Sequence, residues 1–302
     1  MRRGWLAGLA VVCSARVAAT DPDPKLDVKD LKSLTADPLT GKADRIDGDE
    51  TGGMVAFTFD DGPNPITTPD VIDALEKYNV PATFFIVTQR IVGKLGAKSR
   101  DVLARELSDG FMVGSHSVTH PNLGKADATI LDHEVDASLR TLAIQANRPI
   151  GMFRPPYGSM NKAGRIRLKQ LGLTEVQWSV DTMDWASHNA ERLRKRTVAM
   201  IFKQNGGVVL MHDVKPITAH TISGILDDVE AENCKRLAGG KEPIIPVSLH
   251  YFMRDAKTPR AIPPEVAART EAYKKALPAR CAARPAPKEP PPPPKDAHAS
   301  SK

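Results

Sequence analysis

Two adjacent carboxylates, Asp60 and Asp61, stand at the end of an apolar stretch and directly before a Gly-Pro turn. The stretch 54–59 (Met-Val-Ala-Phe-Thr-Phe) has the length and the β-branched and aromatic content of a buried strand. Because successive side chains of a strand point to opposite faces, the two carboxylates are expected to do different jobs. A metal ligand beside a proton-transfer group suits this arrangement, and an acidic surface turn is the alternative.

The elements that must position these carboxylates alternate regularly along the chain. Strands are predicted at 54–59, 82–87, 111–114, 150–153, 175–180, 206–211 and 244–249. Helices are predicted between them at 69–78, 101–107, 126–146, 162–171, 190–202 and 218–231. This alternation indicates an α/β fold with a parallel sheet covered by helices, and six or seven such units can close into a barrel.

Polar clusters follow five of the predicted strands at the point where each strand ends. After 60–61 they are 116–120 (His-Ser-Val-Thr-His), 154–158 (Arg-Pro-Pro-Tyr-Gly), 181–185 (Asp-Thr-Met-Asp-Trp) and 212–213 (His-Asp). The carboxyl ends of the strands in a parallel barrel line one face, where the chemistry of such folds takes place. The five clusters are therefore predicted to form one site and not five separate surface loops.

His116 and His120 are four residues apart, close enough for both imidazoles to reach one metal ion. Pro121 disfavours a helical His120, so a tight loop is expected there. Two imidazoles and one carboxylate leave a coordination position open for water, which suits a catalytic divalent ion such as zinc. Polar surface is the alternative reading of the pair.

Other side chains of the clusters have chemistry that fits such a site. Arg154 is always charged and could orient an aspartate, or could form a plain surface salt bridge. Tyr157 lies on a loop stiffened by prolines, where its backbone N–H could face an oxyanion. Trp185 could wall a small apolar pocket with Leu210 opposite, or could simply fill the core.

His212 is the best candidate for a general acid, because only histidine titrates near neutral pH without help. Either Asp184 or the adjacent Asp213 could fix its tautomer and raise its pKa. The residues alone leave this choice open.

Taken together, these clusters resemble the polysaccharide deacetylase family, also known as the NodB homology domain and carbohydrate esterase family 4. The similarity covers roughly Met54 to Ala231 and five motifs. They are Thr58-Phe59-Asp60-Asp61-Gly62-Pro63, His116-Ser117-Val118-Thr119-His120, Arg154-Pro155-Pro156-Tyr157-Gly158, Asp181-Thr182-Met183-Asp184-Trp185 and Leu210-Met211-His212-Asp213.

The resemblance implies a distorted (β/α) barrel of about seven units and a site with one divalent ion, with zinc expected ahead of cobalt or nickel. It implies three metal ligands, Asp61, His116 and His120. It also implies that Asp60 is the general base, oriented by Arg154.

On the other side of the site, the resemblance implies that His212 is the general acid and that Asp184 tunes it. The backbone N–H of Tyr157 would stabilise the oxyanion, and Trp185 and Leu210 would line a pocket for the acetyl methyl group. The implied activity is removal of N-acetyl groups from an N-acetylglucosamine polymer such as peptidoglycan or a chitin-like glycan. An O-acetyl (xylan-type) esterase and a catalytically silent glycan-binding protein are the alternatives.

The two ends of the chain differ in composition from its centre. Residues 1–19 have the basic start, short apolar run and small-residue pattern of a signal peptide, and a retained N-terminal anchor is the alternative. Residues 20–50 are predicted to be a polar linker or a loosely docked arm, and residues 51–255 the catalytic domain. Residues 256–302 are predicted to be an extension that ends in a solvated, proline-rich tail.

Charge and cysteine content place limits on the partners and the compartment. Loss of residues 1–19 would remove three arginines and lower the formal charge from +6 to +3, which is too small to indicate nucleic-acid binding. We expect a secreted or cell-envelope monomer that acts on an acetylated glycan and has no transmembrane segment after signal cleavage. Cys234 and Cys281 could pair in an oxidising compartment or remain free thiols.

Overall fold

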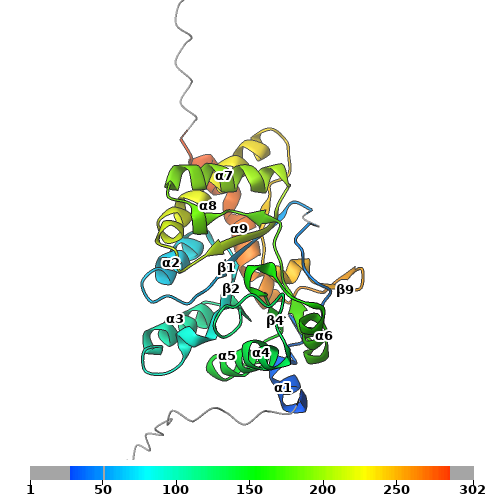
Figure 1. The fold of residues 1–302 in the computed structure, drawn as a ribbon. Helices are drawn as coiled ribbons and strands as arrows, with labels where there is room; N and C mark the ends of the chain where they lie inside the picture. Colours follow the sequence, from blue (N-terminus) through cyan, green and yellow to red (C-terminus); the bar gives the residue numbers. More distant parts are fainter. Residues whose placement is uncertain (1–27, 50–51, 286–302) are drawn as a thin grey trace, which may run out of the picture.

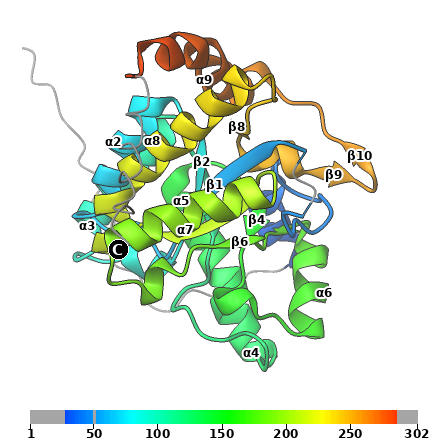
Figure 2. The same ribbon diagram turned by 90° about the horizontal axis from the view of Figure 1, so that it is seen from above.

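A curled parallel sheet forms the centre of the computed structural model, which describes residues 28–49 and 52–285. Within these residues the sheet has eight strands in the order β5-β4-β3-β2-β1-β7-β6, and β8 pairs with the start of β1. The strands are β1 (Met54–Asp60), β2 (Ala82–Ile86), β3 (Met112–Ser115), β4 (Met152–Phe153), β5 (Thr174–Glu175), β6 (Val180–Asp181), β7 (Gly207–His212) and β8 (Ile245–Pro246). Helices surround this incomplete barrel (Figure 1 and Figure 2). The predicted distorted (β/α) barrel is confirmed.

The helices that cover the sheet lie close to their predicted positions. They are α2 (Thr68–Tyr78), α3 (Ala97–Ser108), α4 (Ala128–Leu131), the π-helix η2 (Asp132–Ala137), α5 (Ser138–Ala146), α6 (Lys162–Leu171), α7 (Ala190–Lys203) and α8 (Pro216–Ala238). Helix α6 shows why the sequence folds this way locally. The Asn161 side chain accepts a hydrogen bond from the backbone N–H of Gly164 at its start, and Gly172 ends it in the left-handed conformation with φ 72°.

Alternation along β1 decides which side chains reach the interior of the barrel. Val55, Phe57 and Phe59 belong to the core between the sheet and the helices. Ala56 belongs to a second apolar cluster, which also contains Ile46. By the same period of two, the side chains of residues 58 and 60 follow Ala56 toward the interior. A polar site can therefore lie at the end of an otherwise apolar strand.

One predicted strand, at 175–180, is divided in the structure. Glu175 pairs with β4, whereas Val180 pairs with β7 on the other side of the barrel. The chain changes neighbours between these residues, and the gap is bridged by the N-terminal segment. Ile46 forms a parallel bridge with Val176, and the Ser179 hydroxyl donates to the Gly48 carbonyl.

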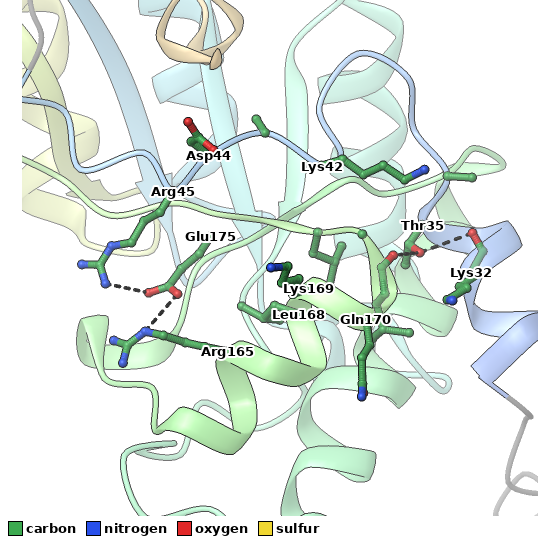
Figure 3. A pocket seen from close by; sticks show the side chains of 15 residues that line it. Lys32, Thr35, Lys42, Asp44, Arg45, Arg165, Leu168, Lys169, Gln170 and Glu175 are labelled. Atoms are coloured by element: carbon green, nitrogen blue, oxygen red, sulfur yellow. Dashed lines mark hydrogen bonds and ion pairs between the residues drawn. The ribbon is translucent and has the colours of Figure 1, made fainter. Parts of the chain in front are cut away.

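The described part of the N-terminal segment, residues 28–49, contacts the barrel, where the sequence predicts a polar linker or a loosely docked arm. Helix α1 (Val28–Thr35) packs on the barrel with Leu31 only 1% exposed, because Leu31 and Ile46 supply the apolar anchors that the composition concealed. A hollow of about 740 Å³ lies between this arm and α6. Figure 3 shows the side chains that line it. Two arginines flank Glu175 there: Arg45 Nη1 lies 3.4 Å from its Oε1, and Arg165 Nε lies 3.3 Å from its Oε2.

The chain after the predicted catalytic domain also folds onto the barrel. Helix α9 (Pro264–Ala283) lies beside α8 (Figure 2), and the side chains of Tyr273 and Leu277 are buried. A disulfide joins Cys234 of α8 to Cys281 of α9, so the two thiols pair. The short elements η5 (Leu249–Phe252), β9 (Arg254–Asp255) and β10 (Thr258–Pro259) connect β8 to α9.

No helix in 28–49 or 52–285 has both the length and the apolar character needed to cross a bilayer. The predicted signal peptide at 1–19 and the proline-rich end of the tail lie outside the described residues.

Candidate functional site

The polar clusters meet at the carboxyl ends of the central strands. Asp60 is the last residue of β1 and pairs in register with His212, the last residue of β7. His116 follows β3 directly, and Arg154 follows β4 directly. The strand ends therefore bring these distant segments together on one face, as predicted.

Asp61, His116 and His120 form a cluster whose potential ligand atoms all lie within 4.8 Å of one another. Asp61 Oδ1 is 3.3 Å from His120 Nε2 and 3.7 Å from His116 Nε2. This carboxylate oxygen is buried and has no hydrogen-bond partner, although buried polar atoms normally have one. An unpartnered oxygen facing two imidazole nitrogens fits a divalent cation, so the three residues suit the predicted metal site.

Contacts on the far side of His116 prepare its ring for such a role. Its Nδ1 lies 2.7 Å from the carbonyl oxygen of Arg154, so Nδ1–H donates there and Nε2 keeps its lone pair toward Asp61. Burial lowers the pKa of His116 against the opposing charges of Asp60 and Asp61, which favours the neutral, ligating form.

The histidines stand on a loop, as predicted, and not on a helix. Ser117 and His120 adopt the left-handed conformation with φ 70° and 67°. Asp61 does so with φ 74°. Such conformations of non-glycine residues cost of order 1–3 kcal/mol each and persist only where the surroundings hold them. Three of them around one small cluster indicate a site held in place by its supports.

Asp60 is paired with a fully buried arginine. Arg154 Nη1 donates to Asp60 Oδ1 at 2.7 Å and to the Thr58 hydroxyl at 2.8 Å, and Nη2 donates to the Gln177 carbonyl at 3.1 Å. The guanidinium carbon lies 4.2 Å from the centroid of the Phe85 ring. Because a buried charge must be paired, this arrangement fixes both side chains. Asp60 Oδ2 is left at 3.6 Å from His116 Nε2, on the side of the metal cluster.

His212 is held by Asp184 and not by its neighbour Asp213. His212 Nδ1 lies 2.8 Å from Asp184 Oδ1, and the backbone N–H of His212 donates to Asp184 Oδ2 at 2.7 Å. The Thr218 hydroxyl donates to the same oxygen at 2.5 Å. Burial lowers the pKa of His212, but the hydrogen bond and charge of Asp184, together with the charges of Asp60 and Asp61, raise it to about 9.

Asp213 points away from His212 and supports the turn after Asp61. It accepts a hydrogen bond from the Thr68 hydroxyl, and burial raises its pKa to about 7. A Cβ added to Gly62 would come within 2.2 Å of the Asp213 carboxylate. Any side chain at position 62 would therefore clash with the Asp213 carboxylate, so glycine is required there.

Of the three residues predicted to touch the substrate, Tyr157 and Trp185 are exposed and Leu210 is buried. Tyr157 is 66% exposed and its ring packs against His120 with centroids 4.6 Å apart. Trp185 is 53% exposed on the short 3-10 helix η4 (Asp184–Ala186), and Leu210 of β7 is buried. The Thr182 hydroxyl donates to the Leu210 carbonyl at 2.8 Å and ties this segment to β7. The pocket they would form together stays a prediction.

Sequence reasoning did not identify the partners that hold these groups. Thr58 shares the inner face of β1 with Asp60, so strand alternation could have identified it. Thr218 lies at the start of α8, far from Asp184 in the chain, and carries no signal beyond its place after Pro216. Gln177 acts through its backbone carbonyl, which no sequence pattern reports.

Comparison with known proteins points to one family. The polysaccharide deacetylase family matches residues 47–176. A peptidoglycan-N-acetylglucosamine deacetylase, PgdA, of Listeria monocytogenes is 34% identical over 195 residues, which are 65% of this chain and 40% of PgdA. A chitooligosaccharide deacetylase of Bradyrhizobium sp. is 36% identical over 173 residues, which are 56% of this chain and 75% of the relative.

Solved structures agree with this assignment. A crystal structure of the Bc1960 peptidoglycan N-acetylglucosamine deacetylase superposes with a TM-score of 0.57 at 27% identity, covering 67% of this chain and 89% of the other. The match to PgdA, by contrast, spans only 40% of that longer protein. With the barrel, the five motifs and these similarities together, the chain belongs to the polysaccharide deacetylase family.

Proposed function

We propose that this protein hydrolyses N-acetyl groups of a polysaccharide that contains N-acetylglucosamine, with the help of a divalent metal ion. The observation that carries the proposal is the cluster of Asp61, His116 and His120 beside the buried Arg154–Asp60 pair, with the His212–Asp184 pair at the end of the neighbouring strand. A binding protein would need neither of these flanking pairs. The names of the relatives, a peptidoglycan deacetylase and a chitooligosaccharide deacetylase, support the same reaction.

Asp61, His116 and His120 would hold the ion. A set of two imidazoles and one carboxylate suits zinc, with cobalt or nickel as alternatives. When bound, such an ion supplies Lewis-acid polarisation of the acetamide carbonyl and lowers the pKa of water.

Asp60 would act as the general base and take the proton of the attacking water. Its Oδ1 is engaged by Arg154 at 2.7 Å, so Oδ2 is the oxygen left to accept that proton. Arg154 cannot give up its own proton near neutral pH, so it keeps the carboxylate oriented and charged.

His212 would act as the general acid and protonate the departing nitrogen. With its pKa raised to about 9, the ring carries a proton at neutral pH, as an acid must before it can give one away. Asp184 accepts from Nδ1, so Nε2 is the nitrogen that delivers the proton.

The surrounding residues would receive the substrate. The backbone N–H of Tyr157 would stabilise the oxyanion of the tetrahedral intermediate, and Trp185 and Leu210 would enclose the acetyl methyl group. The exposure of the Tyr157 and Trp185 rings supports a contact with sugar rings of a polymer at the surface.

The cell envelope is the proposed place of action, with the protein secreted or periplasmic and working as a monomer. The disulfide between Cys234 and Cys281 supports an oxidising compartment. The peptidoglycan deacetylases among the relatives fit an envelope substrate as well.

The test is acetate release from a panel of glycans, with product analysis for free amine. Peptidoglycan, chitin oligosaccharides and acetylated xylan are compared with and without a chelator. The proposal expects acetate and free amine from an N-acetylglucosamine polymer, and loss of both in Asp60→Ala, His212→Ala and Asp61→Ala. Acetate from xylan alone would identify an O-acetyl esterase, and no acetate from any glycan would identify a silent binding protein.

A further inference from the structure

The loop between the two histidines is held from outside the site by a buried carboxylate that no proposed role uses. Glu134 Oε2 accepts hydrogen bonds from the backbone N–H groups of Val118 and Thr119 at 3.0 and 2.9 Å. Its Oε1 accepts from the Thr119 hydroxyl at 2.7 Å. Glu134 is 4% exposed, so these three contacts occupy a carboxylate that is almost entirely removed from water.

The same loop is held on its other side by the segment after β2. The backbone N–H groups of Thr88 and Gln89 donate to the carbonyls of Ser117 and Val118 at 3.1 Å each. The Ser117 hydroxyl accepts from the backbone N–H of His120 at 2.9 Å. The loop's N–H groups thus bond to Glu134, and its carbonyls bond to residues 88–89. These two sets of hydrogen bonds together maintain the left-handed conformations of Ser117 and His120.

The helix that carries Glu134 is built to reach this loop. Glu134 lies in the π-helix η2, and Ser138 follows four residues later at the start of α5 on the same face. The Ser138 hydroxyl is 2.7 Å from that of Ser115, the residue directly before His116. One face of the helix therefore touches the histidine segment at both of its ends. Single π turns inside α-helices are common at functional sites, where they place a side chain out of the regular register.

We propose that Glu134 is a positioning residue for the metal site, acting through the backbone of Val118 and Thr119 to place both imidazoles. The inference rests on the metal site proposed above. Glu134 bonds to Val118 and Thr119 and to none of the three proposed ligands, and it has no part in the reaction. Its effect is on where His116 and His120 stand before any ion arrives, so it should govern metal affinity.

The chain offers two informative changes at this position. In Glu134→Ala all three hydrogen bonds are lost, and the part-buried backbone N–H groups of Val118 and Thr119 lose their protein acceptor. In Glu134→Gln the amide oxygen can still accept from both N–H groups, and the amide NH₂ can donate to the Thr119 hydroxyl. The glutamine variant therefore keeps the clamp and removes only the charge.

Asp136 provides a matched control on the same π-helix. It is 5% exposed, and its carboxylate accepts from Arg167 Nε of α6 at 2.9 Å and not from the histidine loop. Asp136→Ala breaks a comparably buried interaction of the same segment. A general loosening of the helix would therefore show in this variant as well.

The experiment measures zinc affinity of the full chain by competition with a chromophoric chelator, alongside the absorption spectrum of the cobalt-substituted protein. We expect Glu134→Ala to bind zinc about 10–100-fold more weakly and to show an altered cobalt spectrum. Glu134→Gln and Asp136→Ala should stay within about threefold of wild type.

Wild-type zinc affinity in Glu134→Ala would overturn the proposal, and so would equal losses in Glu134→Ala and Asp136→Ala. If Glu134→Ala does not fold, rescue of folding and affinity by Glu134→Gln supports the clamp, and a tenfold loss in Glu134→Gln overturns it. Asp61→Ala separates the two proposals. Wild-type zinc affinity in that variant would overturn the metal site itself, and with it the clamp.

Discussion

Replacement of Asp184 by asparagine should remove the acid function of His212 while leaving the barrel folded. Asparagine keeps the shape of the side chain but not its charge. In the native chain Asp184 contacts Nδ1 and the backbone N–H of His212 at 2.8 and 2.7 Å. Burial lowers the pKa of His212, and the hydrogen bond and charge of Asp184 are the main causes that raise it to about 9.

Without that charge, the pKa of His212 should fall toward its ordinary value of about 6.5, because burial then opposes only the charges of Asp60 and Asp61. A difference of this size corresponds to about 3 kcal/mol between the two protonation states. At pH 8 the protonated fraction would drop from roughly 0.9 to roughly 0.03, so an acid-dependent rate should fall roughly 30-fold from protonation alone.

The sign of the pH dependence follows from the raised pKa. Native His212 is protonated below about pH 9, so kcat/KM for acetate release should decline as the pH rises through that value. The matching contribution to folding stability is fully present below the unfolded pKa, near 6.5, and is lost as the pH rises through about 9.

Two measurements check this prediction: the pH profile of kcat/KM and the NMR titration of the His212 ring. In Asp184→Asn the alkaline limb should move down by about two pH units or more. Thr218→Val is the matched control, since it removes one hydrogen bond to Asp184 but keeps the charge, and its limb should move far less. An unmoved limb and an unchanged titration in Asp184→Asn would refute the reasoning.

Three further outcomes are expected. Gly62→Ala should destabilise the fold by about 1–3 kcal/mol in urea unfolding, because the new Cβ would meet the Asp213 carboxylate at 2.2 Å; an unchanged midpoint would argue against this close approach. Cys234→Ser should cost about 4 kcal/mol under non-reducing conditions, since the bond to Cys281 closes a separation of 47 residues, and equal stability of variant and wild type would speak against the cross-link. Zinc at about 100 times its Kd should raise the unfolding free energy by about 2.7 kcal/mol in the wild type and have no effect in Asp61→Ala; an equal response of both would place the ion elsewhere.

Much of the barrel could be predicted because local sequence patterns mark its strands and helices. Helix α6 begins and ends at the predicted residues, 162 and 171, since an asparagine cap and a left-handed glycine mark its ends. The convergence of polar clusters followed from a general property of parallel sheets, that strand ends meet on one face.

The sequence itself could have decided whether Asp184 or Asp213 is the partner of His212. Asp213 follows His212 directly, so strand alternation sends their side chains to opposite faces. Asp213 accordingly meets Thr68, and the partner of His212 comes from η4. The alternation rule that separated Asp60 from Asp61 would also have separated His212 from Asp213.

Other features depend on contacts between segments far apart in the chain, which no local pattern carries. The division of 175–180 into β5 and β6 follows from a change of neighbouring strand. The docking of α9 depends on Tyr273, Leu277 and a disulfide to a distant helix. The hydrogen bonds of Glu134 depend on a π turn within what the sequence predicts as an ordinary helix.

The most direct test of the central claim is the amount of acetate released from an N-acetylglucosamine polymer by protein that has been stripped of metal and then reloaded with one equivalent of zinc. We expect no release from the stripped protein, full recovery on reloading, and no recovery in Asp61→Ala. Undiminished release from the stripped protein, or recovery in Asp61→Ala equal to wild type, would contradict it.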